Sequence, residues 1–394
     1  MATVKVDVAP AVLIWARESM GLSLEEAAKR TKMDALSLRF FEEGIGDPTL
    51  SQVERMSKAY QRPLIAFFLP EPPNDVDQLP DFRLLPENRS RLWSPELHEV
   101  FRRVRAQREA AAAIADVTND PLPEIRMSLH LTDDPEHAGE EIRSWLRAPS
   151  PDELVQLPPG KVFHAWSHAI EGHPILVTQV EEAPLNEMRG FSLSDRPFPA
   201  IAVNSKDSLR GRVFTLAHEL AHVLLGDGGV CDLEERRKTP KTKKERLERF
   251  CNEVAAATLM PRKHVLMHRL VRGTAKSHQW SDEELGVLSR MFGVSSEAML
   301  LRLVTLDKAT MDYYFRRRRH FLALYEEQRR REEQNKSSGG MTYYERKVRN
   351  YGRRFIQTVI DAYNEEHING ADLAHYLNIK LNNLPSLIEE LDKA

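Results

Sequence analysis

The most informative stretch of the sequence is Thr215-Leu216-Ala217-His218-Glu219-Leu220-Ala221-His222. Apolar residues repeat around it at helical spacing, which predicts a buried helix over 213–225 that Gly226 terminates. His218 and His222 are four residues apart, so on a helix both imidazoles point the same way and reach one ion. Glu219 lies beside that face, where its carboxylate reaches water activated by a metal without being a ligand itself. The stretch therefore predicts a catalytic metal centre.

A catalytic zinc ion needs a third protein ligand and an open fourth position. We expect Glu248, which follows His218 by 30 residues (248 − 218) on a second predicted helix over 246–259. Asn252 lies one turn further along the same face, where its amide oxygen can accept the free N–H of a ligand histidine. Glu253 is the alternative ligand, and it points about 100° away from Asn252 on a helix. The sequence thus predicts Zn²⁺ held by two histidines and a glutamate, with Glu248 preferred.

The expected chemistry is hydrolysis of a peptide bond. Glu219 takes a proton from the attacking water as general base and then passes it to the leaving nitrogen. His173 is one of several residues that would fit a role in stabilising the oxyanion, and the sequence does not choose among them. A purely structural zinc ion is disfavoured, because only three good ligands are visible and Glu219 is placed for chemistry.

The two motifs together resemble those of the ImmA/IrrE family of zinc peptidases. The resemblance rests on Arg212–His222 and on Glu248–Pro261, and it extends over about residues 165–265. It implies a zincin-like fold and places the family's glutamate ligand at Glu248. Val254 stands where the family often has phenylalanine, which leaves the site assignment intact. Family members cleave helix-turn-helix repressors, and some act in stress response, mobile elements or toxin–antitoxin pairs, so the resemblance implies a regulatory protease with few substrates.

The N-terminal part reads as a run of short helices. Ser23 and Glu26 form a predicted capping box, and Asp34 is a predicted helix cap. This pattern is similar to the Xre/Cro-type helix-turn-helix, with Leu24–Arg30 as its first helix and Asp34–Glu43 as its recognition helix.

Candidate DNA contacts in this module are Arg30, Lys32 and Arg39. Residues 1–75 contain 9 Lys/Arg and 11 Asp/Glu, a net charge of −2, and the expected recognition helix ends in two glutamates. The geometry of such a helix favours DNA, whereas this charge disfavours it. Binding of DNA and docking of a protein therefore both stay open.

The expected fold class is α+β. We predict a mainly helical, zincin-like peptidase domain with a small β-sheet, flanked by all-α modules of helix-turn-helix type. The predicted strands are 175–179, 189–193 and 200–204, and further helices are expected over 94–117, 281–303 and 308–333. The expected parts are a helix-turn-helix domain (1–70), a Pro-rich linker (71–93), the peptidase domain (94–305), a charged helix (306–335), a linker (336–342) and a C-terminal helical module (343–394).

Composition narrows the class of protein. Hydrophobic residues make up 41% and charged residues 29%, as is ordinary for a soluble globular protein. A net charge of −3 argues against a protein held mainly by phosphate backbones, and Arg316–Arg319 is expected to be a solvated helix face. The two cysteines, Cys231 and Cys251, are too few for a disulfide framework, and no segment reaches the roughly 20 apolar residues of a membrane span. We therefore expect a cytoplasmic protein without a membrane partner.

Two functions compete at this stage. The first is a zinc endopeptidase that cleaves a partner, a repressor or toxin encoded by a neighbouring gene. The second is a DNA-binding repressor or antitoxin, of a toxin–antitoxin or phage-defence pair, whose peptidase domain mainly binds that partner. Operator DNA and a second copy of the chain are further expected partners.

Overall fold

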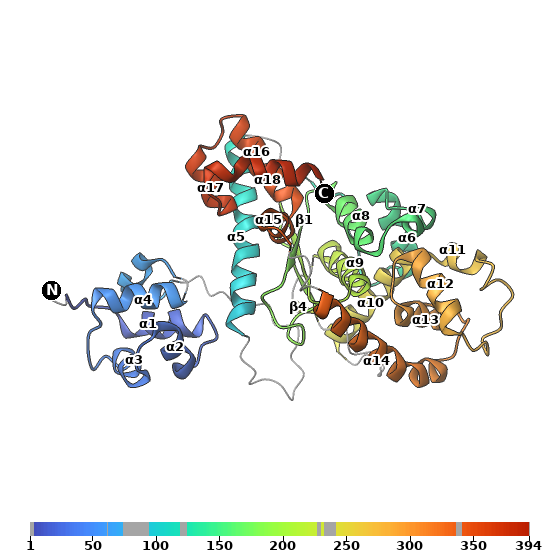
Figure 1. Cartoon of the computed structure of the whole chain (residues 1–394), viewed down its shortest axis with the longest axis horizontal. Helices are drawn as coiled ribbons and strands as arrows, with labels where there is room; N and C mark the ends of the chain where they lie inside the picture. Colours follow the sequence, from blue (N-terminus) through green and yellow to red (C-terminus); the bar gives the residue numbers. More distant parts are fainter. Residues whose placement is uncertain are drawn as a thin grey trace. The chain divides into compact units, whose positions relative to one another are not determined.

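The computed structural model describes residues 4–60, 62–73, 94–118, 124–226, 230–231, 242–335 and 341–393. The chain forms two compact units, Met1–Arg103 with Glu182–Glu187, and Val104–Glu181 with Met188–Ala394 (Figure 1). The expected linkers and the charge-dense stretch before the second motif helix lie mostly outside the described residues. None of the described helices is both long and apolar enough to cross a lipid bilayer.

The first unit contains the expected run of short helices, which are α1 (Pro10–Glu18), α2 (Leu24–Thr31), α3 (Ala35–Glu42), α4 (Leu50–Tyr60), η1 (Leu64–Phe68) and the start of α5 (Pro95–Thr118). Both predicted caps are confirmed. Ser23 and Glu26 form the capping box of α2, and the Asp34 carboxylate accepts the amide N–H of Ser37 at the start of α3. Buried apolar side chains such as Leu38 and Met56 form the core of this unit.

The second unit combines a small sheet with many helices and is α+β, as expected. Its elements are α6 (Pro135–Leu146), α7 (Pro151–Gln156), α8 (Pro159–Glu171), β1 (Leu176–Val180), β2 (Gly190–Leu193), β3 (Ala200–Asn204), α9 (Leu209–Leu225), β4 (Val230–Cys231), α10 (Lys243–Leu259), α11 (Arg262–Met267), α12 (Asp282–Phe292), α13 (Ser296–Thr305), α14 (Met311–Asn335), α15 (Tyr343–Tyr351), α16 (Arg353–Asn364), α17 (Gly370–Leu377), η3 (Leu381–Asn383) and α18 (Leu384–Lys393). The sequence analysis missed α6, α7, α8, α11 and the two-residue strand β4.

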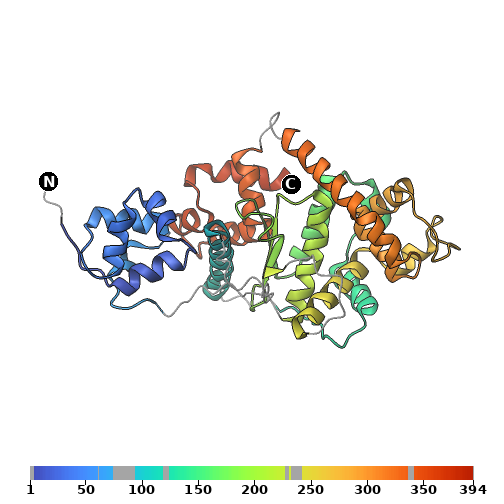
Figure 2. The same cartoon turned by 90° about the horizontal axis from the view of Figure 1, so that it is seen from below.

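The sheet has the strand order β1-β3-β2-β4. Strand β1 runs parallel to β3, whereas β2 is antiparallel to both β3 and β4. Helix α9 packs against β2 and β3, and Figure 2 shows it (light green) running alongside the sheet. Every residue of β1, β2 and β3 is buried, because the sheet is covered by other elements.

The C-terminal helices are anchored on the edge strand β1. The Thr178 hydroxyl donates a hydrogen bond to the carbonyl of Asn350, at the end of α15. At the start of α16, the Glu171 carboxylate accepts the amide N–H of Arg354 at 3.1 Å. Glu171 is only 9% exposed, and this burial raises the pKa of its carboxyl to about 7. A buried carboxyl group therefore lies at the junction between α8 and the C-terminal helices.

Candidate metal centre

Helix α9 has a serine cap at its start and a glycine at its end. The Ser208 hydroxyl accepts the amide N–H of Gly211 at the first turn. Gly226 adopts a left-handed conformation with φ of 70° directly after the last turn, which confirms it as the helix terminator. Every residue from Val213 to Leu224 is buried. The helix therefore carries the motif into the interior of the second unit, and the motif's polar side chains are buried with it.

Helix α10 is held at both ends. Thr242 and Glu245 form a capping box at its start. At its other end the carbonyl of Thr258 accepts a hydrogen bond from Arg143, and the carbonyl of Met260 accepts one from Arg302. Two arginines thus satisfy backbone acceptors that the end of a helix leaves without partners. This fixes α10 beside α9, with which it is in contact.

Three predicted ligands meet where α9 and α10 pack together. The Nε2 atoms of His218 and His222 are 3.1 Å apart. Glu248 places Oε2 at 3.4 Å from Nε2 of His218 and Oε1 at 3.6 Å from Nε2 of His222. One ligand atom from each residue lies within 4.8 Å of the others. The structure therefore brings the two histidines and the glutamate into a single cluster.

The spacing of these atoms fits a tetrahedral ion. Zinc bound at about 2.0–2.1 Å with tetrahedral angles separates its ligand atoms by about 3.3 Å. The two histidine Nε2 atoms are 3.1 Å apart, close to that value, and each of them has a different oxygen of Glu248 within 3.6 Å. The two histidine side chains are fully enclosed, whereas Glu248 is 17% exposed. Solvent thus reaches the cluster at its glutamate.

Glu253, the alternative ligand, is not part of this cluster. Its carboxylate accepts a hydrogen bond from the guanidinium of Arg249 at 2.8 Å, one turn earlier on α10.

Asn252 lies on α10 one turn after Glu248. Its Oδ1 atom and the Nδ1 atom of His218 are both buried, and neither has a hydrogen-bond partner among the described residues. The expected hydrogen bond from a ligand histidine to Asn252 is not formed here, and it stays a prediction.

Glu219 is almost completely buried, with 1% exposure. Its Oε2 atom accepts a hydrogen bond of 2.9 Å from the hydroxyl of Ser192, which lies on β2. The sequence analysis missed Ser192. The sequence showed that Ser192 and Gly190 lie on the same face of a predicted strand. It did not show which helix packs against that face.

Further residues singled out in the sequence have partners elsewhere. His173 stacks on Trp145 with ring centroids 3.8 Å apart, and its Nε2 atom lies 3.2 Å from the Trp145 carbonyl. In the arginine cluster, Arg317 pairs with Asp282 and Arg318 with Glu297. His173 and two of the four arginines therefore make contacts within the second unit.

The candidate DNA contacts all lie on the first unit. Arg39 is exposed on α3, and Lys32 is an exposed residue at the end of α2 with φ of 53°. Arg30 forms an ion pair of 2.7 Å with Glu96.

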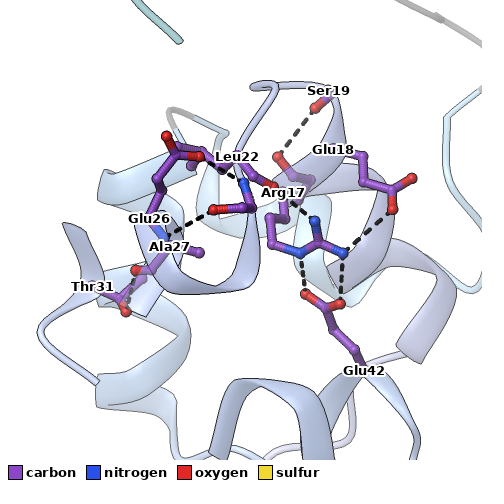
Figure 3. A network of polar contacts seen from close by, with 10 residues as sticks. Arg17, Glu18, Ser19, Leu22, Glu26, Ala27, Thr31 and Glu42 are labelled. Atoms are coloured by element: carbon purple, nitrogen blue, oxygen red, sulfur yellow. Dashed lines mark hydrogen bonds and ion pairs between the residues drawn. The ribbon is translucent and has the colours of Figure 1, made fainter. Parts of the chain in front are cut away.

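Glu42 at the end of α3 pairs with Arg17 through two hydrogen bonds, of 2.7 and 2.8 Å (Figure 3). The negative charge of this glutamate is therefore compensated within the unit, which weakens the electrostatic argument against DNA.

Two family models match the chain. Residues 175–304 match the IrrE N-terminal-like domain of peptidase family M78, and residues 13–67 match a helix-turn-helix. The first match contains α9, α10 and the whole cluster, and the second contains α2, α3, α4 and most of α1. No curated protein and no solved structure matches the chain.

Proposed function

Because the chain joins an IrrE N-terminal-like domain of peptidase family M78 to a helix-turn-helix domain, we propose that it is a zinc-dependent endopeptidase of regulatory type. It cleaves a partner or repressor protein in the cytoplasm, where its two cysteines stay reduced. The observation that carries this proposal is the cluster of His218, His222 and Glu248, whose ligand atoms all lie within 4.8 Å of one another.

Each residue has a defined part in this proposal. When bound, zinc supplies a Lewis acid that activates water and polarises the peptide carbonyl. Glu219 accepts the proton of the attacking water and delivers it to the leaving nitrogen. The Oδ1 atom of Asn252 accepts a hydrogen bond from the Nδ1–H group of His218 and so orients the imidazole, since both atoms are buried and have no other described partner.

Zinc content tests the ligand set. Glu248→Gln is expected to lose bound zinc, because Gln presents one neutral oxygen in place of a carboxylate. Glu253→Gln is the matched control, since it makes the same substitution one turn further on α10 and leaves the cluster intact. Elemental analysis of both variants decides the point. Loss of zinc in the control but not in Glu248→Gln would overturn the assignment.

Cleavage tests the catalytic role. Glu219→Gln is expected to keep zinc and the fold but to lose activity, because the amide cannot accept the proton. The substrate to try is the protein encoded by the neighbouring gene, incubated with wild type, Glu219→Gln and wild type plus chelator. Zinc-dependent cuts that Glu219→Gln does not make support the peptidase, whereas cuts made equally by that variant exclude Glu219 as the base.

The second candidate function is a repressor or antitoxin whose peptidase domain mainly binds its partner. The observation that favours DNA binding is the helix-turn-helix with exposed Arg39 on α3 and its Glu42 charge compensated by Arg17. A stable uncut complex with the neighbouring gene product would support this function over the peptidase.

DNA binding is tested by gel shift of promoter DNA at several salt concentrations. Arg39→Ala is expected to weaken the complex, while Lys58→Ala on α4 serves as an exposed control that removes the same charge from a different helix. Equal effects of the two variants would exclude α3 as the recognition helix.

A further inference from the structure

Strand β2 presents an unusual pair of residues to the motif helix. Side chains alternate along a strand, so Gly190 and Ser192 share one face and Phe191 lies on the other. That shared face meets α9, because β2 and α9 are in contact. Two small residues thus stand where a strand next to a buried helix ordinarily carries bulky apolar side chains.

Gly190 lets the strand approach the helix closely. A Cβ atom at this position would lie 2.5 Å from Cγ2 of Thr215 and 3.1 Å from Oε1 of Glu219. Thr215 and Glu219 are one helical turn apart, so both lie on the side of α9 that faces the strand. The missing side chain therefore makes room for the carboxylate of Glu219.

Ser192 supplies a hydrogen-bond donor to the same carboxylate. Its hydroxyl donates to Oε2 of Glu219 at 2.9 Å, and the two residues are 0% and 1% exposed. A carboxylate rotates freely about its last side-chain bond unless partners fix it. The donor on Oε2, together with the strand beside the carboxylate, restrains the carboxylate in a single orientation.

We propose that Ser192 is a positioning residue that sets the orientation of Glu219 for proton transfer. The proposal rests on the peptidase function proposed above. The hydroxyl donates to Glu219 both before and after that carboxylate takes up a proton, because its other oxygen can receive the proton. Ser192 therefore restrains the base throughout the reaction without touching the substrate or the metal.

A merely structural role makes a different prediction. If Ser192 only satisfied a buried carboxylate, Ser192→Ala would lower stability and leave turnover by the folded protein unchanged. If Ser192 positions Glu219, the same variant lowers kcat while KM and zinc content stay the same, because a misoriented base affects proton transfer and not binding.

The experiment uses the zinc-loaded full chain and a library of random fluorescence-quenched octapeptides. The peptide that wild type cleaves fastest is used for kinetics. Ser192→Ala is expected to lower kcat about 10- to 100-fold, in the range for loss of positioned acid–base catalysis, with KM within twofold. Ser192→Thr, which restores a hydroxyl, is expected to recover a large part of kcat. Ser167→Ala removes another buried hydroxyl, which donates to a backbone carbonyl on α8, and is expected to behave as wild type.

The outcomes separate the two proposals. Normal kcat in zinc-loaded, folded Ser192→Ala overturns the positioning role alone, and so does a loss of zinc from that variant. Absence of cleavage of any peptide and of the neighbouring gene product by wild type overturns the peptidase function and the positioning role with it. If Ser192→Ala does not fold, Ser192→Cys takes its place, since it preserves the shape and replaces the hydroxyl by a much weaker donor.

Discussion

Replacing the buried acid between α8 and α16 is expected to stabilise the protein in a pH-dependent way. Burial raises the pKa of the Glu171 carboxyl from 4.5 to about 7, and the hydrogen bond from the Arg354 amide opposes this only in part. Because the pKa is raised on folding, the folded state binds the extra proton. The contribution of Glu171 to stability is therefore most favourable below about pH 4.5 and falls as the pH rises to about 7.

The size of the effect follows from that difference. At about 1.4 kcal/mol for each pKa unit, the ionised Glu171 carboxylate costs about 3 kcal/mol at pH 8, and about 1 kcal/mol or less at pH 5. Glu171→Gln keeps an acceptor for the Arg354 amide without the charge. We expect this variant to exceed wild type in free energy of unfolding by about 3 kcal/mol at pH 8 and to match it closely at pH 5.

Urea unfolding at both pH values measures this difference. Tryptophan fluorescence reports it, because Trp166 and Trp280 are buried in the core of the second unit. Glu140→Gln on α6 is the control, since it removes an exposed carboxylate and is expected to leave stability unchanged at both pH values. A Glu171→Gln protein that is less stable than wild type at pH 8 would refute the reasoning.

Three further substitutions test the packing and the ion pairs inside each unit. Gly139→Ala would place Cβ 2.7 Å from Cβ of Ala257 and is expected to cost about 2 kcal/mol in urea unfolding, whereas Gly160→Ala meets nothing within 4 Å and should cost nothing. Arg302→Met leaves the Met260 carbonyl without its donor and Glu136 without its partner, so thermal unfolding should show a loss of about 3 kcal/mol. Arg17→Met breaks the pair with Glu42, and faster amide hydrogen exchange of α1 and α3 in the full chain is the expected result.

The sequence was most informative where one element carries several agreeing signals. Helix α9 has helical periodicity and a terminating glycine, and both proved correct. Strands β1, β2 and β3 were also found within one residue at each end, because Pro, Gly and Asp bound them, whereas β4 was missed.

Helices α6 and α7 were missed although their start signals were present. Each begins with proline at its first position, after Asp134 or Ser150 as N-cap. Helix α7 spans less than two turns, so it is too short for helical periodicity to show. Helix α6 has 12 residues, and its capping signal at Asp134 deserved more weight.

The hydrogen bond between Ser192 and Glu219 was beyond sequence reasoning for another reason. It joins residues 27 positions apart on a strand and a helix, and only the packing of β2 on α9 brings them together. Likewise, the compensation of Glu42 by Arg17 depends on how α1 and α3 pack, so a count of charges along the chain gave an incomplete account of the recognition helix.

The two helices that carry the cluster are positioned by different neighbours. Helix α9 rests on β2 and β3, whereas α10 packs closely on α6, where Gly139 allows its backbone to approach Ala257. Residues 226–242 connect the two helices, and that connection is too long to fix the distance between His218 and Glu248 by itself. The spacing of the three ligand atoms must therefore be set by the packing of α9 and α10 on one another, on the sheet and on α6. The backbone approach that Gly139 allows is therefore part of what holds Glu248 beside the two histidines.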